Sequence, residues 1–255
     1  GAVGMASGGP TISGTTAQVT AALVTAETRI TAGSAKVTLT NDPTGAELAA
    51  INPKTSGTIT LNDTAQNFSG TATELAAAFD GFGTNALTGT ITITGAAPSP
   101  TELKTISDAT SGAITLPSTN FTLSGTSSVL ADALSGNFTN YAGNVTLTDA
   151  APSAANLAII NNKTSGTVTL NANDATFTGT AADVAAKFAG GLVGTQTGAV
   201  TITDSATATI AATTLSSIGE QTDGTVTVSN AITISGTTAE LTAALVTTGS
   251  LVVAG

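Results

Sequence analysis

The sequence repeats itself, and this repetition constrains the fold more than any other feature. One tripeptide, Ser/Thr-Gly-Thr, begins at Ser13, Ser69, Ser124, Thr178 and Ser235. A second tripeptide, Thr-Ser-Gly or Thr-Asp-Gly, precedes a β-rich run and begins at Thr55, Thr110, Thr164 and Thr222. Both markers recur in the same phase with a period of about 55 residues, which indicates tandem repeats. In such arrays each copy buries its apolar face against its neighbours.

Each period reads as two unequal strand-and-helix halves. One half starts with a strand such as 58–61, continues through a second β-run that ends in Ser-Gly-Thr, and reaches a helix such as 72–80. The other half has a strand such as 90–94, a proline-containing turn and a shorter helix such as 101–107. The strands alternate β-branched residues and the helices use Ala, Leu and Glu, so local propensity and pattern agree.

The acidic residues have a structural explanation at the helix starts. In a capping box, an N-cap hydroxyl and an acid three residues later satisfy each other's free backbone amides. The pattern occurs at Thr71/Glu74, Thr180/Asp183, Thr237/Glu240, Thr44/Glu47 and Ser99/Glu102, with Gln18 after Thr15 and Asn156 after Ser153 as variants. These acids are therefore expected to cap helices and not to form a catalytic pair.

The predicted fold class is α/β. Because a helix connects successive strands, parallel pairing with right-handed crossovers is the simplest arrangement. We expect a tandem-repeat right-handed β/α solenoid, with a parallel sheet on one side and helices on the other. Residues 1–9 are interpreted as a linker or a cloning remnant, and residues 10–255 as one continuous solenoid of about four and a half repeats. The approximate repeat units are 10–54, 55–109, 110–163, 164–221 and 222–255.

The middle residues of successive strands form a predicted threonine column. Its members are Thr38, Thr60, Thr92, Thr115, Thr146, Thr169, Thr201 and Thr227. Apolar residues flank each of them, so period-two alternation turns the threonines away from the helices. The second β-runs each contribute one apolar residue, which we interpret as an edge-covering or second-sheet column: Ile12, Phe68, Leu123, Phe177 and Ile234.

Composition excludes several classes of function. The chain has no His and no Cys, so thiolate nucleophiles, Ser-His-Asp triads and His-based metal sites are impossible. Sixteen acidic residues against 6 basic ones give a net charge of −10, which disfavours nucleic acid and anionic membranes as partners. No apolar run approaches the roughly 18 residues of a membrane span, so membrane insertion is not expected.

The remaining chemical candidates weaken when the periods are compared with one another. A Ser-Lys dyad is conceivable at Lys54-Thr55-Ser56 and Lys163-Thr164-Ser165, but the equivalent positions elsewhere are Ala109 and Gln221. We interpret both lysines as solvated loop charges and do not expect an enzyme. Calcium needs several converging oxygens. The acids that follow strands are interpreted as turn and cap residues, with calcium kept open: Asp42, Asp63, Asp149, Asp174 and Asp204.

The threonine column allows two interpretations. A regular array of threonines on a flat sheet resembles the Thr-x-Thr faces of β-solenoid ice-binding proteins, and residues 90–94 and 201–203 echo that motif. Alternatively, Thr is simply well suited to a solvent-facing strand position. We favour the second interpretation, because the Thr-x-Thr doublet is incomplete in many strands.

In composition and repeat spacing, residues 164–188 and 234–253 resemble the Ala/Thr/Gly-rich tandem repeats of giant bacterial cell-surface proteins, of the marine cyanobacterial swimming-motility type. The resemblance extends over residues 10–255 and implies an extracellular or cell-surface array. The expected function is a non-enzymatic spacer, filament or adhesin stalk. The alternatives are a Thr-ladder binder of ice or of a crystalline or polysaccharide surface, and a calcium-stiffened adhesin. The chain opens and closes within a period, so we expect adjacent repeats of a longer chain or end-to-end copies as partners.

Overall fold

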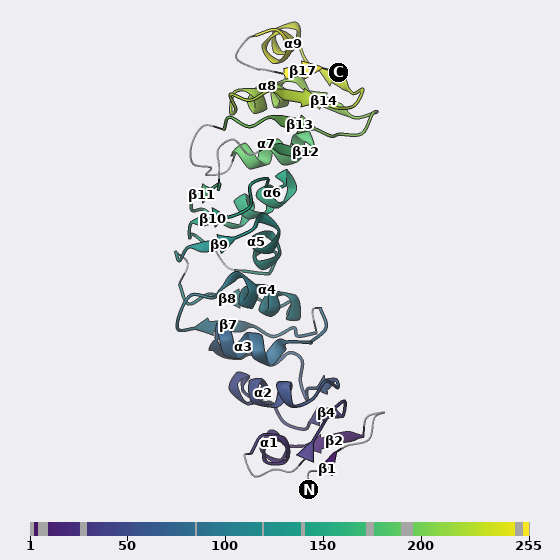
Figure 1. Cartoon of the computed structure of the whole chain (residues 1–255), viewed down its shortest axis with the longest axis vertical. Helices are drawn as coiled ribbons and strands as arrows, with labels where there is room; N and C mark the ends of the chain where they lie inside the picture. Colours follow the sequence, from purple (N-terminus) through teal and green to yellow (C-terminus); the bar gives the residue numbers. More distant parts are fainter. Residues whose placement is uncertain are drawn as a thin grey trace. The chain divides into compact units, whose positions relative to one another are not determined.

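A computed structural model describes the chain as two compact units of α/β structure. The described residues are 3–4, 10–25, 30–84, 86–118, 120–138, 141–171, 176–189, 196–247 and 252–254. Unit 1 comprises Gly1–Ser118 and Ser135–Thr139, and unit 2 comprises Thr119–Leu134 and Asn140–Gly255. Each α-helix is preceded by one or two short strands, and the strand pairs formed by the described residues are parallel, as the sequence predicts (Figure 1).

Unit 1 has three short sheets among its described residues. In one, β1 (Val3–Gly4) pairs with β3 (Ile30–Thr31). The second has the order β2 (Thr11–Gly14), β4 (Lys36–Leu39), β5 (Ile59–Thr60), and the third the order β6 (Phe68–Thr71), β7 (Ile91–Thr94), β8 (Ile114–Thr115). Its helices are α1 (Thr16–Leu23), α2 (Gly45–Ile51), η1 (Asn52–Lys54, 3-10), α3 (Ala72–Phe79) and α4 (Pro100–Ala109).

Unit 2 repeats this plan. One sheet has the order β9 (Leu123–Gly125), β10 (Val145–Leu147), β11 (Val168–Thr169). A second has the order β12 (Phe177–Gly179), β13 (Val200–Ile202), β15 (Val226–Val228), β17 (Val252–Ala254), and β14 (Thr209–Ala211) pairs with β16 (Thr233–Ser235). Its helices are α5 (Ser127–Leu134), α6 (Ala154–Lys163), α7 (Ala181–Ala189), α8 (Ala212–Gly219) and α9 (Thr238–Leu245).

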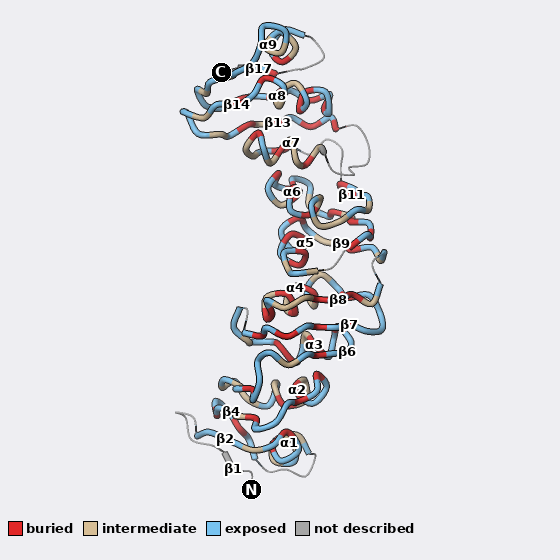
Figure 2. Tube along the Cα trace, turned by 180° about the vertical axis from the view of Figure 1, so that it is seen from behind, coloured by how far each residue is buried: buried red, intermediate tan, exposed pale blue. Residues whose placement is uncertain are grey.

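The core of each unit lies between the strands and the helices. Phe68, Ile91 and Ile114 are aligned across β6, β7 and β8, and all three side chains are buried. Consecutive helices within a unit contact one another and supply the other side of the core, for example Leu75 of α3. Figure 2 shows buried positions alternating with exposed ones along the strands, as a sheet covered on one face requires.

Two expectations about the elements hold only in part. The second β-runs β2, β6, β9 and β12 are terminal strands of their sheets and pair in register with β4, β7, β10 and β13 respectively. The apolar residues Phe68, Leu123 and Phe177 of these strands are buried and Ile12 is half-buried, while in-register pairing satisfies main-chain groups. Only β16 lies in a second sheet, with β14. The helix of the second half is the longer one in two periods, where α4 and α6 have 10 residues against 8 in α3 and α5, and the shorter one in the others, where α2 has 7 against 8 in α1 and α8 has 8 against 9 in α7.

The predicted capping boxes explain where the helices begin. Complete boxes, with both reciprocal bonds, occur at the starts of α1, α2, α3, α4 and α9: Thr15/Gln18, Thr44/Glu47, Thr71/Glu74, Ser99/Glu102 and Thr237/Glu240. At Thr180 and Ser153 the hydroxyl accepts from the N–H of the third helical residue, Asp183 and Asn156 respectively, both at 3.2 Å. Hydroxyl-to-amide capping therefore recurs at helix starts in both units.

The Thr-Ser/Asp-Gly marker is a structural clamp between successive strand–helix units. The buried hydroxyl of Thr110 lies 3.3 Å from the carbonyl oxygens of Leu87 and Gly89, and it accepts the Gly112 N–H at 2.9 Å. In unit 2, Thr222 makes the same contacts with Gln196 O, Gly198 O and Gly224 N–H, at 3.1, 3.1 and 3.0 Å. Thr55 and Thr164 repeat the arrangement.

The glycine of this marker permits the close approach. A Cβ at Gly112 would lie under 3.0 Å from the carbonyl oxygen of Gly89, one strand–helix unit earlier in the chain. The glycine at the corresponding position of the other three markers has the same contact: Gly57 with Ala35, Gly166 with Gly143 and Gly224 with Gly198. The periodic marker is thus explained by backbone packing, without a ligand.

Candidate functional site

The predicted threonine column is divided among four sheets. Cα register places its members in four adjacent pairs: Thr38 with Thr60, Thr92 with Thr115, Thr146 with Thr169 and Thr201 with Thr227. Thr38, Thr146 and Thr201 are half-buried and the other five are exposed. Thr60 lies on β5, in the sheet with β2 and β4, whereas Thr92 lies on β7, in the sheet with β6 and β8. These two neighbours in the predicted column are therefore in different sheets of unit 1.

Sequence reasoning missed that a further hydroxyl extends each pair into a row. The second β-runs pair beside the threonines, so Ser13, Ser69, Ser124 and Thr178 stand next to Thr38, Thr92, Thr146 and Thr201 respectively. Neighbouring strands lie about 4.8 Å apart, which sets the spacing of hydroxyls within a row. Each row is three hydroxyl residues long and can hydrogen-bond a flat, regular surface, but it contains no acid, base or nucleophile pair.

The acids that follow strands act as turn and cap residues where the structure describes them. Asp149 accepts from the Ser127 N–H and hydroxyl at the start of α5, at 3.1 and 2.6 Å. Asp204 accepts from the Ala181 N–H at the start of α7, at 2.7 Å. Asp63 accepts from Ala65 N–H at 2.8 Å, and Asp42 from the Asn62 amide at 3.2 Å.

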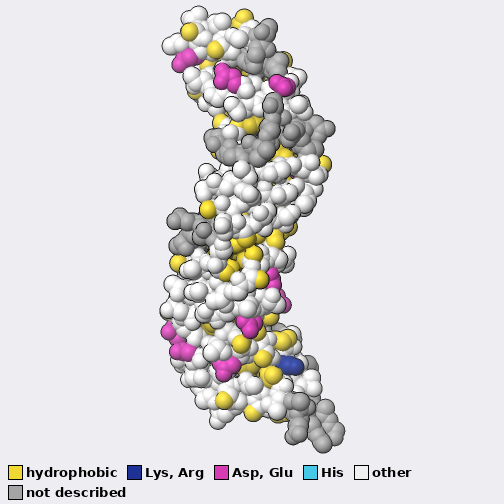
Figure 3. All heavy atoms as spheres, turned by 90° about the vertical axis from the view of Figure 1, so that its left-hand side faces the viewer, with side chains coloured by type: hydrophobic (Ala, Val, Ile, Leu, Met, Phe, Trp, Pro, Cys, Tyr) yellow, Lys and Arg dark blue, Asp and Glu magenta, His cyan; other side chains and the backbone are white. Residues whose placement is uncertain are grey.

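Within the described ranges, no group of three or more acidic side chains converges as a metal site would require. Figure 3 shows acidic side chains at separated places on the face that it draws. Asp174 lies outside the described residues.

The hydroxyls of Thr55, Ser56 and Thr164 in the Ser-Lys candidate segments are bonded to main-chain carbonyls. At 54–56, the Thr55 hydroxyl donates to Ala35 O at 2.5 Å and the Ser56 hydroxyl to Gly33 O at 3.3 Å. At 163–165, the Thr164 hydroxyl donates to Gly143 O at 2.5 Å. A hydroxyl that donates to a carbonyl is not poised to give its proton to a lysine amine, so these segments serve the clamp.

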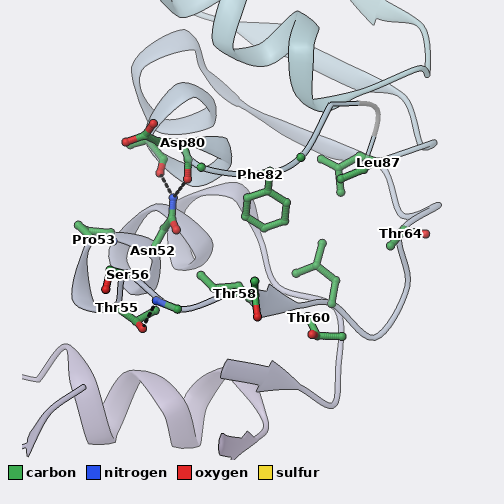
Figure 4. A pocket seen from close by; sticks show the side chains of 17 residues that line it. Asn52, Pro53, Thr55, Ser56, Thr58, Thr60, Thr64, Asp80, Phe82 and Leu87 are labelled. Carbon is green, nitrogen blue, oxygen red and sulfur yellow. Dashed lines mark hydrogen bonds between the residues drawn. The ribbon is translucent and has the colours of Figure 1, made fainter. Parts of the chain in front are cut away.

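Unit 1 contains a concave site among its described residues. Its volume is about 590 Å³, within the range of small-molecule and peptide pockets. It lies between β5 with its preceding turn and the segment 80–87 that follows α3 (Figure 4). Figure 4 shows the Phe82 ring and Leu87 directed toward Thr58 and Thr60. Asn52 closes one end by donating to Ala77 O and Asp80 O at 2.9 and 2.7 Å.

The same place in the following repeat holds a smaller pocket. It has a volume of about 330 Å³ and is lined by Ser107, Asp108 and Thr110 on one side and by Ser135, Gly136 and Asn137 on the other. These residues occupy the positions that the clamp turn and the segment after α3 occupy in the larger pocket. The concavity is therefore a feature of the repeat whose size depends on local sequence.

Lys187 is a buried cation on α7 that sequence reasoning did not single out. Its side chain is 0% exposed, and Nζ lies 2.6 Å from the ring centroid of Phe177 and 3.9 Å from that of Phe188. Nζ has no hydrogen-bond partner among the described residues. Burial lowers the pKa of Lys187 to about 6. Lowered amine pKa values are typical of nucleophilic lysines, but a side chain closed to solvent cannot contact a substrate.

No family model matches the chain, and no curated protein or solved structure matches it at a significant level. Across the described part of the chain, no helix combines the length and apolar character that crossing a bilayer requires.

Proposed function

We propose that the chain is a non-enzymatic structural repeat segment of a large extracellular or cell-surface protein, acting as a spacer, filament or adhesin stalk. In this proposal its alternating strands and helices form a right-handed β/α solenoid, with adjacent repeats or end-to-end copies as partners. The supporting observation is the threonine clamp, which joins successive strand–helix units at Thr55 and Thr110 in unit 1 and at Thr164 and Thr222 in unit 2.

The clamp supports a structural role because the repeated Thr-Ser/Asp-Gly marker forms contacts between neighbouring strand–helix segments. Its hydroxyl reaches carbonyls 20 to 26 residues earlier, such as Ala35 from Thr55 and Gln196 from Thr222. Nearest-neighbour contacts of one kind are what an array needs in order to grow without changing its geometry. Localisation at the cell surface rests on the resemblance of the repeats.

Lengthening the chain by one period tests this proposal. A second copy of residues 110–163 would be inserted after Lys163, and both proteins would be compared by small-angle X-ray scattering and urea unfolding. The proposal expects the maximum dimension and the free energy of unfolding to rise while the cross-sectional radius stays constant. A larger cross-section with unchanged length, or an unfolded insertion, would refute it.

Binding of an ordered surface is a second candidate, favoured by the rows of exposed and half-buried Ser and Thr residues. It expects thermal hysteresis in ice solutions, or adsorption to crystalline polysaccharide, that is lost when Thr92, Thr146 and Thr201 are replaced by lysine. Absence of both effects in the unmodified chain would remove this candidate. The calcium-stiffened alternative expects chelation to lower the melting temperature, and an unchanged melting curve would remove it.

A further inference from the structure

The larger pocket lies against an open strand edge. Val37 N–H donates to Thr58 O at 3.0 Å, so residues 58 and 60 direct their main-chain groups toward β4. Ile59, the residue between them, directs its N–H and C=O away from β4, on the side where the pocket lies. Among the described residues nothing accepts the Ile59 N–H, and β5 pairs with β4 alone.

Two of the equivalent strand edges, beside β8 and β15, are filled. Ile114 of β8 corresponds to Ile59, and its N–H donates to Asn137 O at 2.8 Å, with Phe138 as its parallel bridge partner. In unit 2, Val226 of β15 is paired in parallel with Val252 of β17. In both cases the third strand of a sheet has a parallel segment beside it, with a large apolar residue opposite the first residue of that strand.

The chemistry of the pocket suits the same kind of occupant. Ile59, Leu61, Phe82 and Leu87 supply apolar walls, of which Leu61 and Leu87 are buried and the other two half-buried. Hydroxyls of Thr58 and other residues line the rest of the pocket (Figure 4). An extended peptide would meet apolar groups with alternate side chains and hydroxyls with the others, while Ile59 bonds its main chain.

We propose that this pocket binds an extended peptide segment of a partner protein by β-strand addition, parallel to β5, with an aromatic or large aliphatic side chain placed between Ile59 and Phe82. Two segments of the chain itself that fill such edges are already paired: Phe138 lies beside Ile114, and Val252 lies beside Val226. A second copy therefore has neither of these segments free to donate, which favours a foreign peptide. This inference does not depend on the structural role proposed above.

The test uses a capped heptapeptide with the sequence of residues 135–141, Ser-Gly-Asn-Phe-Thr-Asn-Tyr, which carries the segment that fills the equivalent edge. Binding to the full chain would be measured by calorimetry, and amide exchange by NMR. We expect saturable binding, at least tenfold weaker binding when the peptide's Phe is replaced by Ala, and at least tenfold slower exchange of the Ile59 amide. The Ile114 amide, already bonded, should be protected with or without peptide.

Two variants of the chain complete the test. Ala86→Trp places a large side chain in the pocket and should abolish binding, whereas Ala21→Trp, on an exposed position of α1, should not. Both must keep the melting temperature of the parent chain. Absence of peptide binding, or binding that leaves Ile59 exchange unchanged, would overturn the proposal. Concentration-dependent protection of Ile59 without peptide, lost in Ala86→Trp, would also overturn it by identifying a second copy as the occupant.

Discussion

Replacing Lys187 by methionine should remove most of the pH dependence of stability between about 6.5 and 9. In the unfolded chain the amine titrates near 10.5, whereas in the folded chain burial lowers its pKa to about 6. Between these values the unfolded state binds a proton that the folded state does not. The free energy of unfolding therefore rises with pH through this window, by about 1.4 kcal/mol per pH unit. Below the folded pKa both states are protonated and the dependence ends.

The sequence makes this window unusually easy to interpret. The chain has no His and no Cys, and burial raises the pKa of Tyr141 to about 12, above the range to be measured. The elements that contact α7 include α6 and α8, which contribute one titratable side chain, Lys163, and α7 itself adds Asp183. Few groups besides Lys187 can therefore change protonation between these pH values.

The magnitude at neutral pH follows from the same gap. A difference of about 4.5 pKa units at about 1.36 kcal/mol each places the cost of burying the amine on the order of several kcal/mol at pH 7. Lys187→Met keeps most of the side-chain volume and removes this cost, so the variant should be the more stable protein at pH 7. The two should converge as the pH approaches 10.

Urea unfolding at half-unit pH intervals measures this difference. Lys54→Met is the matched control, because it removes an exposed lysine and should leave the slope of the parent unchanged. Parallel stability curves for the parent and Lys187→Met across the window would refute the reasoning, since they would mean that Lys187 stays charged in the folded protein.

Three further predictions concern the clamp and the caps. Thr110→Val should cost about 1–3 kcal/mol of stability in urea unfolding, because the half-buried Gly112 N–H loses its partner, the hydroxyl of the buried Thr110. Gly112→Ala should cost about 1–3 kcal/mol by overpacking against Gly89 O, whereas Gly83→Ala, with nothing within 4 Å, should be near neutral by the same measurement. Hydrogen bonds from Thr73 and Ser99 lower the pKa of Glu102 in the folded protein. The carboxylate therefore stabilises the fold above the pKa of the unfolded chain, and this stability is lost as the pH falls through the folded pKa. Glu102→Gln should therefore flatten the acid unfolding curve between about pH 5 and 3, monitored by circular dichroism.

The repeat, the parallel strands and the capped helices could be predicted from the sequence alone, because each has a local cause. A hydroxyl followed three residues later by an acid satisfies helix amides wherever it occurs, and alternating β-branched residues specify which face of a strand is buried. The exposed or half-buried threonines of the strands follow from that alternation. The Thr-Ser/Asp-Gly marker was visible as a period, although its meaning was not.

Tertiary structure decided what depends on which segment lies beside which. Register placed the second β-runs in the same sheets as the threonines, and this could not be read from runs of four residues that fit either an edge or a second sheet. The clamp joins residues that local pattern does not relate, Thr110 to Leu87 and Gly89. The pocket lies where the strand edge beside Ile59 stays open. In the next repeat Phe138 fills the corresponding edge, beside Ile114.

The core position of Lys187 could be predicted from the sequence, but the surroundings of its amine could not. Counted from the hydroxyl that begins each long-half helix, it occupies the position of Ala78, Ala133 and Ala244, all of which are buried. Comparison of the repeats therefore marks it as the exceptional residue at a core position. That its amine lies over two aromatic rings without a partner among the described residues was decided only by the packing of α7, because burial depends on neighbours that the local sequence does not specify.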